Sequence, residues 1–429
     1  MDGLWTELPA ELLERVLSFM PVPDLCRLRS VCKRWRSLIC TPEFGKICVQ
    51  NASKGPNVGS CLVVKPSLDL SRSYSAGIPC WSIFDLDAKR WYHIVHELPP
   101  GNDFADVRGM DGGLVCTFVD PFTEAQRQEP VLWNLITGQD CQTLIVANVI
   151  DGAFKVLPRP PLSSGHRIDY LNLNLVVDSI SNTYKVFLVN HYRENRGLID
   201  PWLCVYESPS NQWRKLPDPP VEWSNGWGKQ PRTVMFQGLL YVLFCGPDGF
   251  IDRLFSFKYL EDEWADTGVQ FWKSELHLCD LVVSNNRLFL MTRGLVDHSL
   301  RAYRRSRQPE HFGWPFDISE IRLSDRVCRT VAQMDIAEVC ANFGINRANW
   351  PDSSILCIYK IRSFGFDKSV LLMCTATGKM MLYDLVTGAW ESLPPHPRDG
   401  PWRAFISKDQ GIYRYGKKMN YLRLPNTPW

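Results

Sequence analysis

A unit that recurs along most of the chain constrains its fold more than any other feature. Each copy contains an apolar run, a polar turn, and an aromatic residue that begins another short run, which often ends in Leu-Pro. The aromatic position, held by cysteine in one copy, is filled in chain order by Trp91, Phe154, Trp213, Trp264, Cys328 and Trp390. Successive positions are 63, 59, 51, 64 and 62 residues apart. Short alternating runs bounded by turn residues indicate β-strands, and a period of this size predicts several strands per unit.

The run before each aromatic position is also repeated. Leu203 to Tyr206 precedes Trp213, and the run Val131 to Asn134 is assigned the same place before Phe154, across a longer insertion. A single sheet of four strands cannot bury both of its faces, so the units must stack around an axis. The chain is therefore predicted to form an all-β propeller of six blades over residues 60–429, with the tryptophans filling the space between blades.

The last strands of the chain are expected to complete the ring. Three runs near Arg403 to Ser407, Gly411 to Tyr415 and Tyr421 to Leu424 would join residues 60–94, because closure removes exposed sheet edges. How the two ends of the chain share the strands of this blade is left open by the sequence.

The first 48 residues have a helical pattern instead. Leu12, Leu13, Val16, Leu17 and Met20 lie on one face of a helix that Pro9 can begin and Pro21 ends. Further apolar positions predict two more short helices with a break near Ser30, and residues 49–59 are a linker. Three short helices bury little surface alone, so part of their apolar surface is predicted to bind a partner. The alternative is a helical cap packed on the next domain.

The pattern L-P-x-E-L-L at Leu8, followed by V-C-K-x-W-R at Val31, resembles an F-box over about residues 4–48. This resemblance implies a small all-α domain that binds a Skp-family adaptor, which is joined to a cullin and a RING subunit. The repeated units resemble degenerate kelch repeats, with the diglycine Gly112-Gly113 as one kelch-like feature, as in plant F-box/kelch-repeat proteins. By position, the adaptor-binding and core residues would be Leu8, Pro9, Leu12, Val16, Leu25, Val31, Cys32, Trp35 and Leu38.

The resemblance implies the substrate-recognition subunit of an SCF-type (Skp-cullin-F-box) ubiquitin ligase. The propeller would bind a protein target for ubiquitination and degradation, in the nucleus or cytoplasm. Such a receptor is not itself an enzyme and needs no cofactor or metal. A different class of function remains open, namely a non-degradative scaffold such as a transcriptional co-regulator.

Loops at one end of the propeller are the expected target-binding face. Loops after the Trp-bearing strands, and middle loops such as His191 to Trp202 and Arg301 to Phe316, carry many Trp and Arg residues, which are common hot-spot residues. The alternative is that these tryptophans pack their own loops. The predicted target-binding residues are Arg193, Arg196, Trp202, Trp223, Trp227, Arg304, Arg305, Trp314 and Trp402.

Composition and missing motifs argue against several other classes. The net charge of +2 argues against general nucleic-acid binding. Phosphate-binding, dinucleotide-binding, serine-hydrolase and zinc-protease motifs are missing, and the 15 cysteines form no C-x-x-C pair. Neither a signal peptide nor an apolar run long enough to span a membrane is found, so no membrane partner is expected.

Overall fold

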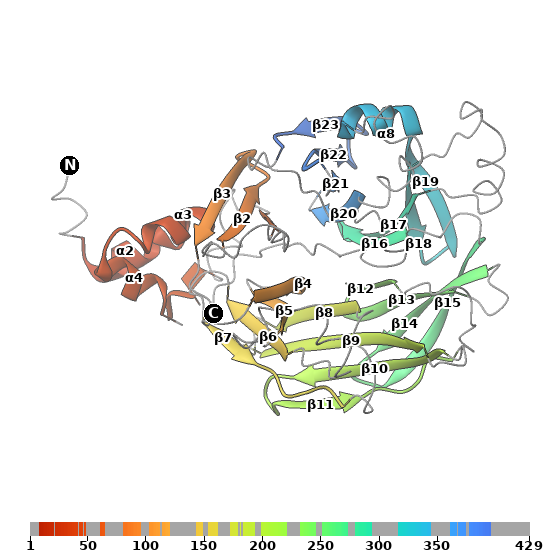
Figure 1. Ribbon diagram of the computed structural model, residues 1–429, viewed down its shortest axis with the longest axis horizontal. Coiled ribbons are helices and arrows are strands. Elements are labelled where there is room, and N and C mark those ends of the chain that lie inside the picture. Colours follow the sequence, from red (N-terminus) through yellow and green to blue (C-terminus); the bar gives the residue numbers. More distant parts are fainter. Residues whose placement is uncertain are drawn as a thin grey trace, which may run out of the picture.

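The computed structural model places three short helices beside a ring of antiparallel sheets (Figure 1). It describes residues 8–48 (except 21, 42 and 46), 61–64, 80–95, 103–111, 114–120, 143–148, 153–161, 172–178, 181, 183–193, 199–220, 232–245, 251–272, 279–293, 316–344, 361–366, 368–374 and 377–395. The helices are α2 (Ala10–Leu17), α3 (Val22–Leu28) and α4 (Lys33–Ile39). They match the predicted helical start, including the break near Ser30.

The strands form six sheets. The first has three strands, β1 (Cys61–Val64), β2 (Cys80–Asp85) and β3 (Arg90–Val95). The second has β4 (Asp103–Asp111), β5 (Leu114–Asp120), β6 (Thr143–Asn148) and β7 (Phe154–Val156). The third has β8 (Asn172–Asp178), β9 (Thr183–Arg193), β10 (Ile199–Glu207) and β11 (Gln212–Lys215).

The remaining three sheets repeat this order. The fourth has β12 (Arg232–Phe236), β13 (Leu239–Cys245), β14 (Ile251–Lys258) and β15 (Glu263–Trp272). The fifth has β16 (Cys279–Ser284), β17 (Arg287–Arg293), β18 (Phe316–Arg322) and β19 (Val327–Met334). The sixth has β20 (Ile361–Phe366), β21 (Ser369–Cys374), β22 (Met380–Asp384) and β23 (Trp390–Leu393), and helix α8 (Ile336–Phe343) precedes it.

These sheets form a β-propeller. The first strands β4, β8, β12, β16 and β20 are neighbours in turn, so they lie innermost, and the last strand of each sheet lies outermost. The described residues contain five complete four-stranded blades and one three-stranded sheet, so the predicted count of six blades is not confirmed. The predicted closing strands at residues 403–424 and the diglycine at 112–113 lie outside the described residues.

The repeated aromatic position has a fixed environment at the start of the outermost strand, where it is the second residue of β3, β11, β15 and β19 and the first residue of β23. Trp91, Trp213, Trp264 and Trp390 pair across the sheet with Phe84, Tyr206, Phe257 and Tyr383, with ring centroids 5.0, 5.4, 4.8 and 4.7 Å apart. Cys328 pairs with Ile321 in the same place, which confirms its assignment to the series. Two residues before each of these five positions the backbone has a positive φ, at Lys89, Asn211, Asp262, Arg326 and Gly388.

The Leu-Pro step after an outermost strand contacts the next blade. The indole N–H of Trp213 donates to the carbonyl of Pro158 at 2.7 Å, and that of Trp264 donates to Pro217 at 3.0 Å. The indole N–H of Trp91 donates to Pro394 at 3.2 Å. Each proline follows the outermost strand of the preceding sheet, so the third bond joins the first sheet to the sixth.

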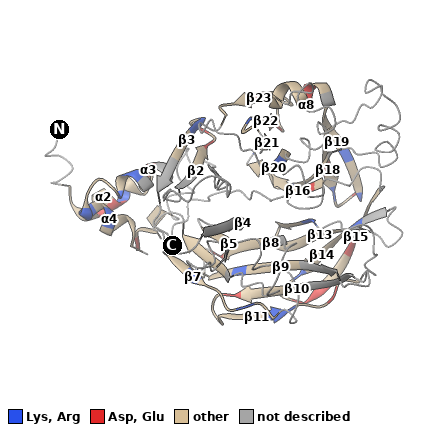
Figure 2. Ribbon diagram, viewed as in Figure 1, with Lys and Arg blue, Asp and Glu red and all other residues tan. Residues whose placement is uncertain are grey.

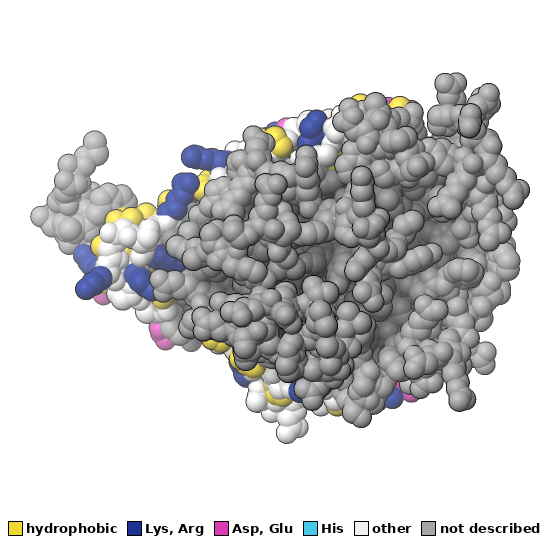
Figure 3. Space-filling model, in the orientation of Figure 1, with side chains coloured by type: hydrophobic (Ala, Val, Ile, Leu, Met, Phe, Trp, Pro, Cys, Tyr) yellow, Lys and Arg dark blue, Asp and Glu magenta, His cyan; other side chains and the backbone are white. Residues whose placement is uncertain are grey.

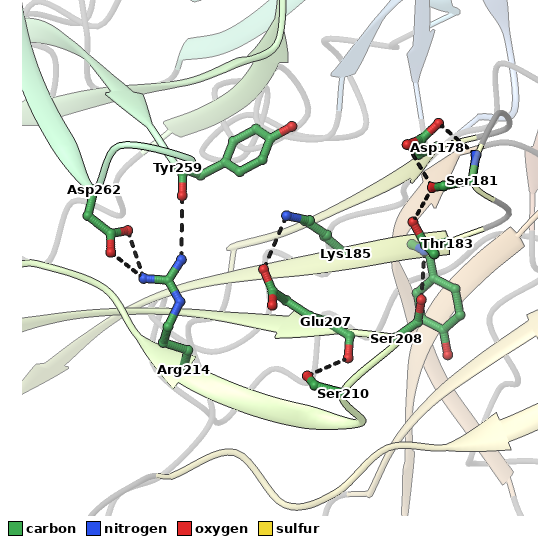
Figure 4. Close-up of polar contacts among 11 residues, drawn as sticks. Asp178, Ser181, Thr183, Lys185, Glu207, Ser208, Ser210, Arg214, Tyr259 and Asp262 are labelled. Atoms are coloured by element: carbon green, nitrogen blue, oxygen red, sulfur yellow. Dashed lines mark hydrogen bonds and ion pairs between the residues drawn. The ribbon is translucent and has the colours of Figure 1, made fainter.

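An ion pair spans two of the junctions between neighbouring sheets, and the positions of the basic and acidic residues are exchanged between the two. Arg214 of the third sheet binds Asp262 of the fourth at 2.6 Å and also donates to the carbonyl of Tyr259 (Figure 4). In the equivalent places, Glu391 of the sixth sheet pairs with Lys89 of the first. The first and sixth sheets are therefore joined by the same kinds of hydrogen bond and ion pair as consecutive sheets of the ring.

Apolar side chains fill the spaces between neighbouring sheets. Clusters of buried residues join the second sheet to the third, the third to the fourth, the fourth to the fifth, the fifth to the sixth, and the sixth to the first. The cluster between the fifth and sixth sheets also includes Val339, Cys340 and Phe343 of α8. A further cluster joins the first two sheets to the N-terminal helices.

One predicted strand was wrong. Phe154 pairs with Ala147 on β6, so the strand before Phe154 is Thr143–Asn148 and not Val131 to Asn134. The apolar letters at 131–134 resemble a strand, but alternation alone does not show which of two nearby runs pairs with β7.

Candidate functional site: an apolar surface on the N-terminal helices

Helix α2 has one broad apolar face, of which only part is buried. Leu13 and Leu17 are fully buried, whereas Leu12 and Val16, also one turn apart, are 49% and 44% exposed. An α-helix in a small domain normally turns one apolar stripe inward and leaves polar residues outside. The exposed part of this face is therefore a candidate surface for a partner.

The turn after α2 extends this exposed surface. The N–H of Phe19 donates to the carbonyl of Val16 at 3.3 Å, and that of Met20 donates to Leu17 at 2.9 Å, so the chain makes a tight turn directly after α2. Phe19 is 48% exposed and Met20 is 37% exposed. They follow Leu12 by seven and eight residues, the spacing at which residues of a continuing helix would share a face. We call Leu12, Val16, Phe19 and Met20 the α2 apolar stripe.

The connection between α3 and α4 exposes a further large apolar residue. Val31 is 63% exposed and lies just before Cys32, the N-cap of α4. The Cys32 thiol accepts the backbone N–H of Trp35 at 3.4 Å, which fixes the first turn of α4. The Arg34 guanidinium donates to the carbonyl of Leu8 at 3.0 Å and thereby ties α4 to the segment that precedes α2.

The nine residues predicted to supply the core and the adaptor contacts separate by burial. Pro9, Leu12, Val16, Val31 and Cys32 are exposed, and Leu8 and Trp35 are half-buried. Leu25 and Leu38 are buried in the helical core, against which Trp35 packs. The stripe adds Phe19, which the prediction did not include, and Met20, which it had placed only on the helical face. Their spacing from Leu12 was the available signal.

Basic residues recur along these helices (Figure 2). The guanidinium of Arg27 is 3.8 Å from the carboxylate of Asp24, one turn earlier in α3. Figure 3 shows hydrophobic and basic side chains together on the part of the surface that the helices form. The exposed basic residues of these helices are Arg15, Arg27, Lys33, Arg34 and Arg36.

The second predicted site, the Trp/Arg-rich loop face, falls mostly outside the described residues. Arg196, Trp223, Trp227, Arg304, Arg305, Trp314 and Trp402 all lie there. The backbone of Arg193 belongs to β9 and that of Trp202 belongs to β10, where Trp202 pairs with Asn190. The predicted middle loop from His191 to Trp202 was therefore too long, since the strands extend to Arg193 and begin again at Ile199.

In the part of the chain that the structure describes, no group of three or more His, Cys, Asp or Glu residues is placed to hold a metal ion. Nor does any described helix combine the length and apolar character needed to cross a membrane.

Comparison with known proteins identifies the N-terminal helices. Residues 5–47 match the F-box domain family, so the chain carries an F-box at its N-terminus. The F-box only protein 6 of Arabidopsis thaliana is 25% identical over 271 residues, which are 61% of this chain and 47% of the relative. An Arabidopsis F-box/kelch-repeat protein is 26% identical over 262 residues, 58% of this chain and 53% of that one.

A third relative has a higher identity over a shorter region. The Arabidopsis protein UNUSUAL FLORAL ORGANS is 33% identical over 193 residues, which are 43% of this chain and 38% of that protein. The matched regions thus span about half the length, or less, of these relatives. Together with the propeller, the matches place the chain among homologues of plant F-box/kelch-repeat proteins.

Proposed function

We propose that the protein is the substrate-recognition subunit of an SCF-type ubiquitin ligase. In this proposal the F-box binds a Skp-family adaptor that is joined to a cullin and a RING subunit, and the propeller binds the protein target. The observation that carries the proposal is the α2 apolar stripe, which lies on a matched F-box domain and leaves Leu12 and Val16 about half exposed.

The mechanism requires binding and no catalytic group in this chain. A receptor that holds its target and the adaptor together turns an encounter in solution into one at high effective concentration. Transfer of ubiquitin to target lysines is then favoured by proximity. The target is proposed to bind at the Trp/Arg-rich loops of the propeller, as the sequence predicts, and the complex to work in the nucleus or cytoplasm.

The adaptor interface is tested with the double variant Leu12→Ala/Val16→Ala. These side chains are half exposed and contribute little to the core, so the variant should fold. Removing about five carbon groups from an interface at about 0.8 kcal/mol each costs up to about 4 kcal/mol, so adaptor affinity should fall between tenfold and a thousandfold. Affinity is measured by calorimetry with purified adaptor.

The matched control is Leu260→Ala. Leu260 is 80% exposed in the turn between β14 and β15, so the leucine-to-alanine half of the double change is repeated outside the F-box helices. This variant should bind the adaptor as the wild type does. If the wild type captures neither adaptor nor cullin, the proposal is wrong. Capture of the adaptor without cullin would favour the non-degradative scaffold.

A further inference from the structure

The F-box helices and the propeller share one core. Leu13, Leu25, Ile39 and Phe44 of the helical region pack in the same cluster as residues from the first two sheets. Those residues are Ile83 and Tyr92 of the first sheet and Val115 and Ala147 of the second, all of them buried. The helices therefore cover the junction between these two sheets directly, rather than being connected through a linker alone.

This junction differs from the others in the ring. Trp91, Trp213, Trp264 and Trp390 are half-buried at their junctions, but Phe154, the residue in this position of the second sheet, is 45% exposed. At the junction of the first and second sheets, the helices supply the apolar contacts with Val115 and Ala147. The F-box thus occupies a place that the outer aromatic residue helps to fill elsewhere.

Two arginine guanidinium groups lie near one aromatic ring at this contact. The guanidinium carbon of Arg27, in the last turn of α3, is 4.5 Å from the ring centroid of Tyr92 on β3. Arg90, on the same strand as Tyr92, is 5.6 Å from that centroid. Tyr92 is only 8% exposed, and burial is the main cause that raises the pKa of its phenol, so the ring stays neutral. A cation over a desolvated ring is attracted by the ring quadrupole, and the contact restricts how α3 can turn on β3.

We propose that Arg27 and Tyr92 are positioning residues that hold the F-box at a fixed angle to the propeller. The angle determines which lysines near the propeller face the ubiquitin-transferring subunits. The fixed angle depends only on the contact between α3 and β3. The effect on which lysines are presented rests on the proposed function.

The spread of this angle is measured as the distribution of distances between two spin labels, by double electron–electron resonance. Labels are attached to encoded ketone amino acids at Ser37 in α4 and at Leu260, because both positions are exposed and the native cysteines then stay unlabelled. The wild type should give one narrow distance distribution. Arg27→Glu places an anion over the ring and beside Asp24, and should broaden the distribution at least about twofold.

Two variants control for charge and folding. Arg27→Lys keeps a cation over Tyr92 and should keep the narrow distribution. Arg36→Glu makes the same change of net charge at an exposed site in α4 and should leave the distribution unchanged. A broad distribution in the wild type, or an Arg27→Glu distribution as narrow as that of the wild type, would overturn the proposed joint.

The consequence for ubiquitin transfer is read on the receptor itself, because the target is unidentified. In the reconstituted ligase, mass spectrometry gives the share of ubiquitin on each propeller lysine. With the receptor saturated by adaptor, Arg27→Glu should change these shares. Unchanged shares alongside a broadened distance distribution would refute the effect on transfer. Failure of the wild type to bind the adaptor would refute the proposed function and leave the distance measurement to decide the joint.

Discussion

Replacing Trp213 with phenylalanine isolates the hydrogen bond that joins neighbouring blades. The phenylalanine ring keeps the contact with Tyr206 but removes the N–H that donates to Pro158 at 2.7 Å. Pro158 is half-buried, so its carbonyl loses a partner where water reaches it only in part. An acceptor left unpaired in such a place costs about 1–3 kcal/mol, and the smaller ring costs about 1 kcal/mol more in lost apolar burial.

Trp390→Phe is the matched control for ring size. Trp390 also packs on a tyrosine, with a centroid distance of 4.7 Å to Tyr383. The outermost strand of the preceding sheet, β19, leads through Asp335 into α8 without a Leu-Pro step. The same substitution therefore removes ring volume but no bond of the Trp213–Pro158 kind, and should cost only about 1 kcal/mol.

Thermal unfolding followed by far-ultraviolet circular dichroism compares the two variants. A difference of about 1–3 kcal/mol corresponds to a melting midpoint about 1–4 °C lower for Trp213→Phe than for Trp390→Phe, given the unfolding entropy of a chain of this size. Trp264→Phe, which loses the bond to Pro217, should fall with Trp213→Phe. Equal midpoints for Trp213→Phe and Trp390→Phe would refute a stabilising role for the indole–carbonyl bond.

Three further changes test other parts of the structure. Gly365→Ala should destabilise the protein by more than about 3 kcal/mol or prevent folding, because a Cβ there would overlap the backbone carbonyl of Val283. Gly238 has φ of 76°, but a Cβ there would meet no neighbour, so Gly238→Ala should cost only about 1–2 kcal/mol. Both free energies of unfolding are measured by chemical denaturation. The backbone N–H groups of Thr387 and Val386 lower the pKa of Asp384, so its charge stabilises the fold above the unfolded pKa, and this stabilisation is lost as the pH falls through the lower folded pKa. The stability advantage of the wild type over Asp384→Asn should therefore shrink in melts taken from pH 6 downwards, and a constant difference would contradict the assignment. Adaptor binding should slow the alkylation of the exposed Cys32 by maleimide. Burial raises the pKa of Cys48 to about 12, so this thiol should react slowly with or without adaptor. An unchanged alkylation rate at Cys32 would show that it lies outside the interface.

The repeated unit made much of the propeller predictable from the sequence. The spacing of the aromatic positions located the outermost strands, and even the cysteine at 328 was assigned correctly, because the turn before it has the same length as the others. The sequence did not indicate that the proline carbonyl of the Leu-Pro step accepts a hydrogen bond from the neighbouring blade. The carbonyl that accepts the indole proton belongs to the preceding repeat, and a pattern within one unit contains no information about which unit lies next to it.

Other features depended on pairing or on tertiary packing. The strand at 143–148 was missed because two apolar runs precede Phe154 and only the register with β7 distinguishes them. Helix α8 was also missed, although Asp335 and Glu338 form a capping box and Gly344 ends the helix with φ of 64°. Its eight residues resemble the short apolar runs around them. Only the local capping residues at its two ends distinguish this helix from a strand of the β-repeat.

The division of α2 into a buried and an exposed side shows the limit of periodicity most clearly. Leu12, Leu13, Val16 and Leu17 all fit one broad apolar face, so spacing alone could not separate core from surface. The separation follows from where the other helices and the first two sheets lie, since they cover Leu13 and Leu17 and leave Leu12 and Val16 exposed. Because the same packing joins the F-box to the propeller, the surface offered to a partner and the angle at which it is offered are set by one core. A substitution in that core should therefore affect both properties, whereas Leu12→Ala/Val16→Ala should weaken partner binding without changing the angle.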